Sequence, residues 1–361
     1  MSIFAIMKFV KLIIYFFIFR TVNQANAQEV KESEFLIYSE LYSSKSIHNL
    51  EKPSYLCSYD QNNYPSTNII LLKWSSNSNF QNKNSFLRYN IGLMIGDYVN
   101  SNLKNEPRTL QNIYESNVGI KFSKNMSLDF GIFNSHIGFE SAIGQESWTC
   151  TRSILADNTP YYEAGYRLNY ESDNKKWKGN LNFLNGWQKM TANFNDQKSW
   201  GHQIQYIPNK KITINSSSYF GQSPNVQNRS RYFHNFYSQY QLNNKIGFIV
   251  GIDNGYEFDK NESLKNAKYY YSPIFITKYT INSKSSITGR FEYFKDENRI
   301  LNSTYLKEVK GYSVNYDYQI EKSSTLRLEA RMLQHKESDI LDKKDKNNIF
   351  FSVVFCTKIN Q

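Results

Sequence analysis

The sequence is poor in the residues that build disulfide scaffolds and metal centres. Its 361 residues include three cysteines, Cys57, Cys150 and Cys356, and only seven prolines. The cysteines show no C-x-x-C or zinc-ligand spacing, and an odd number of thiols cannot complete a disulfide framework. We therefore predict no metal, cofactor or disulfide-scaffold function. An oxidising compartment would permit one bridge, between Cys57 and Cys150, and the alternative is that all three thiols stay unpaired.

Long hydrophobic runs are also missing. The longest run, residues 12–19, is shorter than the roughly 20 residues that a membrane-spanning helix needs. Two lysines precede this run, and residues 25–27 (ANA) supply the small side chains that a signal peptidase requires. We therefore predict a signal peptide over residues 1–27 and an exported domain over residues 28–361.

The chain contains neither a hydrolase motif nor a concentrated basic surface. G-x-S-x-G and H-E-x-x-H are absent, and the five histidines are scattered. The nearest Ser–His pair, Ser135 and His136, would point to opposite faces of an extended strand. The formal net charge of +11 is spread over turns and alternate strand positions, without the basic stripe of a nucleic-acid-binding protein. No catalytic residue and no nucleic-acid partner are predicted.

The sequence is rich in alternation between apolar and polar residues. In residues 311–320 (GYSVNYDYQI) the apolar residues take every second position, and residues 326–332 (LRLEARM) repeat the pattern. A strand has this period of two, and a helix does not. Aromatic residues make up 16% of the chain, which is typical of proteins whose rings line two lipid–water interfaces. One face of each strand is therefore expected to meet lipid and the other water.

These segments predict an all-β fold, a single transmembrane antiparallel β-barrel of about 16 strands (14–18). The expected strands are residues 35–42, 67–74, 86–97, 112–122, 126–133, 161–171, 177–187, 200–207, 211–220, 231–242, 245–254, 269–281, 285–294, 309–320, 324–333 and 348–357. The alternative is a soluble β-sandwich or propeller, which would have loops of unsystematic length.

Connection lengths favour the barrel. Short turns follow the even-numbered segments and long connections follow the odd-numbered ones, with residues 75–85 as the exception. Outer-membrane barrels have this asymmetry, with short periplasmic turns and long extracellular loops. Trp177 and Trp187 lie on one parity of the same segment, and we expect their indoles to mark opposite membrane interfaces.

One stretch resembles a known family. It comprises residues 131–144 (GIFNSHIGFESAIG), 151–158 (TRSILADN) and 160–163 (PYYE), with residues 53–59 (PSYLCSY) upstream and 184–188 (LNGWQ) downstream. In these motifs the chain resembles the OmpL-like β-barrel porins. The resemblance implies a porin-like barrel over most of residues 28–361 and defines no particular solute.

A barrel of this size encloses an aqueous channel, and charges on its inward parity would tune ion preference. A slight excess of cations among these residues suggests weak anion preference. For any single residue, the alternative is an ion pair between neighbouring strands. The candidate pore-lining residues are Arg88, Glu115, Glu163, Arg167, Arg231, Arg290, Glu292, Arg327 and Arg331.

The connection over residues 134–160 is exceptionally long and contains apolar residues that a fully solvated loop would not keep. Loops of this length are usually functional or disordered. We expect it to fold into the lumen as a constriction, and the alternative is an outward cap over the mouth. Its candidate functional residues are His136, Glu140, Glu146, Arg152 and Asp157.

The predicted function is passive diffusion of small hydrophilic solutes through the outer membrane of a Gram-negative bacterium. The expected partners are outer-membrane lipid, these solutes, the barrel-assembly machinery during biogenesis and other copies of the chain in a homo-oligomer. One alternative is a non-conducting structural or partner-binding barrel. Another is a barrel hydrolase, since residues far apart in the sequence can converge in the fold.

Overall fold

The computed structural model describes residues 30–47, 53, 55–59, 63–79, 86–192, 198–224, 228–259, 267–301, 307–336 and 347–361. The predicted signal peptide, residues 1–27, lies outside the described residues. Among the described helices, none has the length and apolar character needed to cross a membrane.

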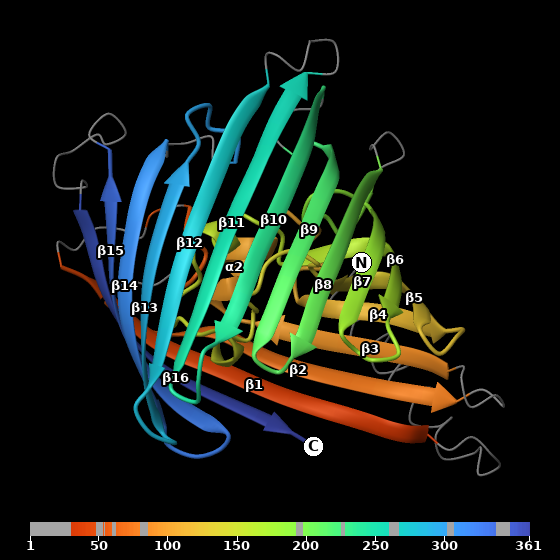
Figure 1. Ribbon diagram of the computed structural model, residues 1–361, viewed down its shortest axis with the longest axis horizontal. Coiled ribbons are helices and arrows are strands. Elements are labelled where there is room, and N and C mark those ends of the chain that lie inside the picture. Colours follow the sequence, from red (N-terminus) through yellow and green to blue (C-terminus); the bar gives the residue numbers. More distant parts are fainter. Residues whose placement is uncertain are drawn as a thin grey trace, which may run out of the picture.

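Antiparallel strands close into a single barrel, which confirms the predicted all-β fold (Figure 1). The strands are β1 Val30–Ser46, β2 Pro65–Asn79, β3 Phe86–Ile95, β4 Ile113–Lys121, β5 Met126–Asn134, β6 Tyr162–Glu171, β7 Trp177–Leu184, β8 Ser199–Asn209, β9 Ile212–Gln222, β10 Arg229–Gln241, β11 Ile246–Asp259, β12 Lys268–Thr280, β13 Ser285–Lys295, β14 Glu308–Gln319, β15 Ser324–His335 and β16 Asn347–Asn360. Each strand pairs with its neighbours in sequence, and β1 pairs with β16, so that Leu41 lies opposite Phe355.

Short and long connections alternate around the barrel. One rim carries turns such as residues 122–125, 172–176 and 320–323, and the other carries longer connections such as residues 96–112 and 135–161. The sequence predicts a long connection at residues 75–85 as the one exception to this alternation. That prediction is wrong, because β2 continues to Asn79. The added residues 75–79 (SSNSN) have no apolar alternation, and they join the sheet through backbone pairing with β1 and β3.

The burial pattern is the reverse of that in a soluble sheet. On β14 the side chains of Tyr312, Val314 and Tyr316 are 38%, 58% and 36% exposed, whereas the intervening Ser313 and Asn315 are buried. Apolar side chains therefore form the outer surface of the barrel, and polar side chains face its interior. This arrangement is the one that a lipid environment stabilises.

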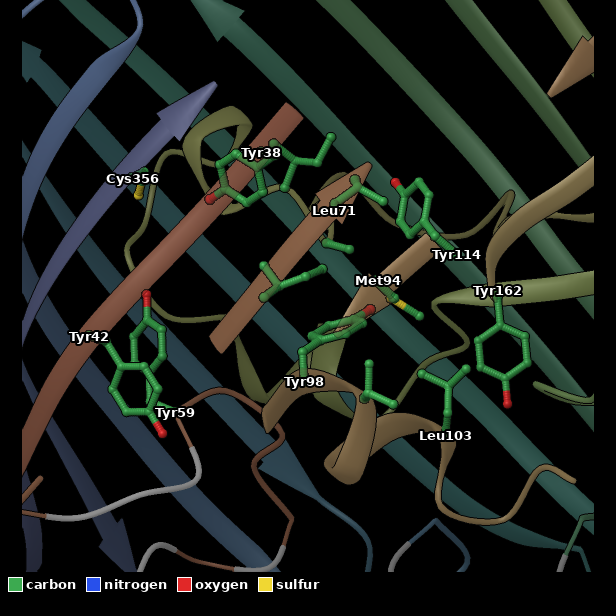
Figure 2. Packing of buried hydrophobic residues seen from close by; sticks show 14 of the residues in the cluster. Tyr38, Tyr42, Tyr59, Leu71, Met94, Tyr98, Leu103, Tyr114, Tyr162 and Cys356 are labelled. Carbon is green, nitrogen blue, oxygen red and sulfur yellow. The ribbon is translucent and has the colours of Figure 1, made fainter. Parts of the chain in front are cut away.

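Part of the interior is also apolar, because connections between strands fold into it. Helix α2, Asp97–Leu103, buries Tyr98 and Leu103 in a cluster with Leu71 and Met94 from the barrel wall. Figure 2 shows these side chains packed together on the inner side of the strands. The lumen is therefore partly filled, and this filling determines which wall residues remain accessible.

The two tryptophans of the seventh predicted strand have different environments. Trp177 is 47% exposed on the outer surface, as expected for an interfacial residue. Trp187 does not mark the opposite interface, because β7 ends at Leu184. After the positive φ of Gly186, the Trp187 ring packs against Tyr219 and Phe233, with ring centroids 4.9 and 5.2 Å away. The expectation for Trp187 was wrong because the strand ends earlier than its sequence pattern suggested.

Candidate functional site

The connection between β5 and β6, residues 135–161, reaches across the barrel interior, and we call it the inner loop. It contains the short helices η1, Gly144–Glu146, and α3, Ile154–Asp157. Arg327 on β15 donates hydrogen bonds to the carbonyl oxygens of Gly144 at 2.6 Å and Ser147 at 3.0 Å. Figure 1 shows the yellow inner loop and the orange helix α2 within the ring of strands.

A network of four charged residues on β13 and β15 holds the middle of the inner loop. Arg290 pairs with Glu329 at 3.2 Å, and Arg331 pairs with Glu292 at 2.6 Å. Glu329 accepts a hydrogen bond from the Thr151 backbone at 3.0 Å, and Glu292 accepts one from the Ile154 backbone at 2.7 Å. The loop therefore supplies donors that satisfy these buried carboxylates.

Four of the predicted pore-lining residues thus come together beneath the inner loop. Arg290, Glu292, Arg327 and Arg331 are 4%, 0%, 2% and 3% exposed. They lie on the inward face, where they pair with one another, with Glu329 or with Asp317, and contact the loop. Their role in lining a water-filled channel stays a prediction.

The first residues of the inner loop are anchored to the opposite wall. His136 Nδ1 lies 2.8 Å from Glu163 Oε2, and Arg167 donates to the same carboxylate at 3.0 Å. His136 Nε2 lies 2.8 Å from the carbonyl oxygen of Ser218 on β9. Gly201 on β8 leaves room for the imidazole, since a Cβ there would lie 2.6 Å from it. His136, Glu163 and Arg167 therefore form one buried polar group.

Ser135 and His136 lie beyond the end of β5, so the expectation that they point to opposite faces of a strand does not apply. Ser135 Oγ donates to Glu163 Oε1 at 3.3 Å, and His136 contacts the same side chain. The shared carboxylate orients both residues and helps to fix the start of the inner loop.

The other loop candidates also make structural contacts. Glu140 accepts hydrogen bonds from Ser153 and, at 3.1 Å, from Thr149 Oγ1, which ties two parts of the loop together. Burial raises the pKa of the Glu140 carboxyl. Arg152 is 1% exposed, with its guanidinium 5.9 Å from the Tyr98 ring. Glu146 pairs with Lys358 at 2.6 Å, so this loop meets β16 as well.

Asp157 joins the inner loop to the connection between β1 and β2. Its carboxylate accepts hydrogen bonds from the Cys57 backbone at 3.1 Å and from Tyr161 Oη at 2.8 Å. Cys57 and Cys150 are separate thiols in the structure, and no disulfide joins them. Cys150 Sγ instead lies 3.6 Å from Tyr59 Oη.

The remaining predicted pore-lining residues lie at several places on the inner wall. Arg231 pairs with Glu257 at 2.8 Å and lies beneath the Trp187 ring. Glu115 pairs with Lys73 at 2.6 Å, and Arg88 pairs with Asp129 at 2.5 Å. Arg88 is the most accessible of them, since its side chain is 37% exposed. Most of the predicted charges are therefore paired between strands.

One large cavity lies at the end of the barrel that carries the short turns. It has a volume of about 580 Å³ and is lined by residues of β3 to β8, with the turns at residues 122–125 and 172–176. Arg88, Lys121 and Lys178 are among its charged residues. Within the described parts of the chain, no group of His, Cys, Asp or Glu has the arrangement of a metal site.

Sequence reasoning missed the apolar part of the interior. Residues 69–72 (IILL) are apolar on both parities, and the inward Ile69 and Leu71 pack in the cluster that includes α2. Gly247 was also missed, although a Cβ there would lie 2.6 Å from the Trp148 ring of the inner loop. Loss of strict alternation and glycines on the inward parity are the signals that could have identified this packing.

The family model described as "Putative beta-barrel porin-2, OmpL-like" matches residues 41–358. No curated protein sequence matches the chain. Similar solved structures include OmpT of Vibrio cholerae in a trimer form, with a TM-score of 0.60, 10% identity, and coverage of 92% of this chain and 100% of that one.

Two channels are similar in fold as well. The anion-selective porin from Comamonas acidovorans has a TM-score of 0.59 and 7% identity, with coverage of 91% of this chain and 99% of that one. The outer membrane channel DcaP of Acinetobacter baumannii has a TM-score of 0.61 and 10% identity, with coverage of 91% and 96%. At these identities the likeness shows the fold alone.

Proposed function

The chain belongs to the family of putative beta-barrel porins-2, OmpL-like, and we propose that it is a passive outer-membrane channel for small hydrophilic solutes. The observation that supports this most is the closed barrel with apolar residues outside and polar residues inside. Such a barrel needs lipid around it, and its polar interior suits hydrophilic solutes. Two proteins of similar fold are a porin and an outer membrane channel by description.

The proposal includes export by the signal peptide, insertion by the barrel-assembly machinery and residence in the outer membrane of a Gram-negative bacterium. It also includes a homo-oligomer, for which the trimer form of a similar barrel is the support. The predicted pore-lining charges would set ion preference where they border open space, as Arg88 does at the large cavity.

Within this channel, the inner loop would be the constriction. It contacts β9 through His136, β13 through Ile154 and β15 through Thr151, so it bridges strands on separate parts of the wall. A segment fixed at several points restricts a lumen more firmly than a solvated cap, because each buried polar contact opposes its movement.

The test is the conductance of the refolded chain in planar lipid bilayers, together with swelling of liposomes in sugars of graded size. We expect discrete conductance steps and entry of small sugars, with larger oligosaccharides excluded. A barrel that inserts fully but gives neither current nor swelling would contradict the channel.

A second candidate is a barrel whose lumen is closed by its own loops and whose long connections bind a partner outside the membrane. It is favoured by the near-complete burial of Arg290, Glu292 and Arg331 beneath the inner loop. The same bilayer measurement separates the two functions. This second candidate predicts zero conductance in the native chain and conductance only after part of the inner loop has been removed.

A further inference from the structure

We propose that the large cavity at the short-turn end is a binding vestibule for small anions that carry hydroxyl groups, such as a sugar carboxylate. The inference rests on the proposed channel function only for the route by which the solute arrives. The cavity has a volume of about 580 Å³, which lies within the roughly 300–1,000 Å³ that is usual for small-molecule sites. The cavity can therefore hold a monosaccharide with its water.

The charge of the lining favours an anion. Its two acidic residues, Glu171 and Asp173, are already paired, with Lys178 at 3.2 Å and with Lys124 at 3.0 Å. Five cations line the same cavity and outnumber the two acidic residues. They are Arg88, Lys121, Lys124, Lys175 and Lys178. A concave, partly enclosed surface concentrates such a field and raises the local concentration of anions.

Two of these cations lack an acidic partner within the described residues. Lys121 Nζ lies 5.4 Å from the centroid of the Phe86 ring, which positions the ammonium without neutralising it. Lys175 lies in the turn between β6 and β7, and the ion pairs of that turn belong to its neighbours. These two ammonium groups are the ones available to a carboxylate.

Amide side chains line the wall beside the cations and can recognise hydroxyl groups. Asn180 donates to Gln203 at 3.0 Å, Gln203 donates to Asn215 at 2.9 Å, and Gln205 donates to Tyr237 at 3.1 Å. Each of these amides has a second N–H and further acceptor capacity. A hydroxyl group needs both a donor and an acceptor, and an amide supplies both.

Two of these amides, Asn180 and Gln203, belong to a chain of hydrogen bonds in which every donor points the same way along the wall. Arg167 donates to Asn182 at 2.7 Å, and Asn182 donates to Asn180 at 2.6 Å. From Gln203 the chain continues through Asn215 to Asn235 and ends at Asp253. Because every link has a defined donor and acceptor, each amide has one favoured orientation, which lowers the entropic cost of binding a solute.

The test measures equilibrium binding to the refolded chain in detergent by isothermal titration calorimetry, with D-glucuronate, D-glucose and acetate as probes. We expect glucuronate to bind more tightly than either of the others, because it alone uses both the cations and the amides. The double variant Lys121→Gln, Lys175→Gln should weaken glucuronate binding roughly tenfold, the usual effect of losing charge-assisted hydrogen bonds.

The matched control is Lys284→Gln, which removes an exposed lysine from a different short turn at the same rim. It should leave glucuronate affinity unchanged. As a measurement that needs no variant, raising the salt from 0.1 M to 1 M should weaken glucuronate binding and leave glucose binding nearly constant, since the Debye length falls from about 10 to 3 Å.

Equal affinities for glucuronate and glucose would overturn the vestibule. So would a loss of glucuronate affinity in Lys284→Gln as large as that in the double variant. The result is separable from the channel test. Binding without conductance supports the vestibule and removes the channel, whereas conductance without glucuronate binding removes the vestibule and leaves the channel.

Discussion

At the scale of single residues, buried charges on β13 and β15 are satisfied by ion pairs between strands and by backbone groups of the inner loop. Arg327 pairs with Asp317 at 2.9 Å and donates to two loop carbonyl oxygens. A buried ion pair contributes little net stability by itself, but removing one partner leaves the other charge desolvated and unpaired. Arg327 is therefore the residue whose loss should affect the loop most.

We predict that Arg327→Met destabilises the docked inner loop by about 3–5 kcal/mol, the usual cost of breaking a buried ion pair from one side. The only tryptic site in the loop is Arg152, which is 1% exposed. Limited trypsin digestion of the folded variant should therefore cleave after Arg152 while the native chain resists.

The control for this prediction is Arg229→Met. Arg229 also pairs with a carboxylate, that of Asp259 at 3.3 Å, but this pair is partly exposed and lies on β10 and β11. Such pairs contribute about 0–1 kcal/mol, so Arg152 should stay protected. Equal cleavage in both variants would mean that Arg327 does not hold the loop.

At the scale of elements, the inner loop and α2 determine how much of the barrel interior is open. The loop packs against β13, β15 and β16, and α2 fills space beside β2 and β3. The walls of β6, β7 and β8 remain open to the large cavity. The accessible part of the lumen is therefore asymmetric, and the inner loop borders it on one side.

We predict that deleting residues 141–153 raises single-channel conductance. The deletion removes the segment that contacts Arg327, Glu329 and Lys358 and so should open the part of the lumen that this segment occupies. Planar bilayer recording measures the effect. Arg229→Met, which removes a partly exposed ion pair between β10 and β11, is the comparison and should leave conductance near its native value. Unchanged conductance after the 141–153 deletion would remove the constriction hypothesis.

At the scale of the whole molecule, stability depends on matching the outer surface to lipid. The exposed large apolar residues recur around the barrel, from Leu72 and Ile91 to Val314 and Phe351. In water this surface would drive aggregation, and in a bilayer it is solvated. Pairing of β1 with β16 also leaves no open sheet edge.

We predict that Val314→Arg destabilises the barrel in lipid vesicles by about 2–4 kcal/mol, the cost of arginine on the lipid face near the membrane midplane. Val314 is 58% exposed on the outer face of β14. Urea unfolding followed by tryptophan fluorescence measures the change. Lys310→Arg, on the same face of the same strand, keeps its charge and should have almost no effect. A compact, monomeric native chain in detergent-free buffer would contradict the membrane barrel itself.

The sequence by itself determined the barrel, because a period of two is a local property of each strand. Residues 311–320 and 326–332 show it directly, and the alternation of turn and loop lengths orders the strands. Polar residues can also continue a strand, because backbone pairing does not depend on alternating side chains. Residues 75–79 do this. That is why these residues were missed although the topology was predicted.

Only the tertiary structure decided the contacts inside the barrel. Arg327 and Gly144 are far apart in the sequence, and nothing in either local pattern indicates that one binds the other. The same holds for His136 and Ser218, and for Lys121 beside the amides of β7 and β8. Period and turn length are set by neighbouring residues, whereas the lumen is shaped by strands and loops that meet only when the barrel closes.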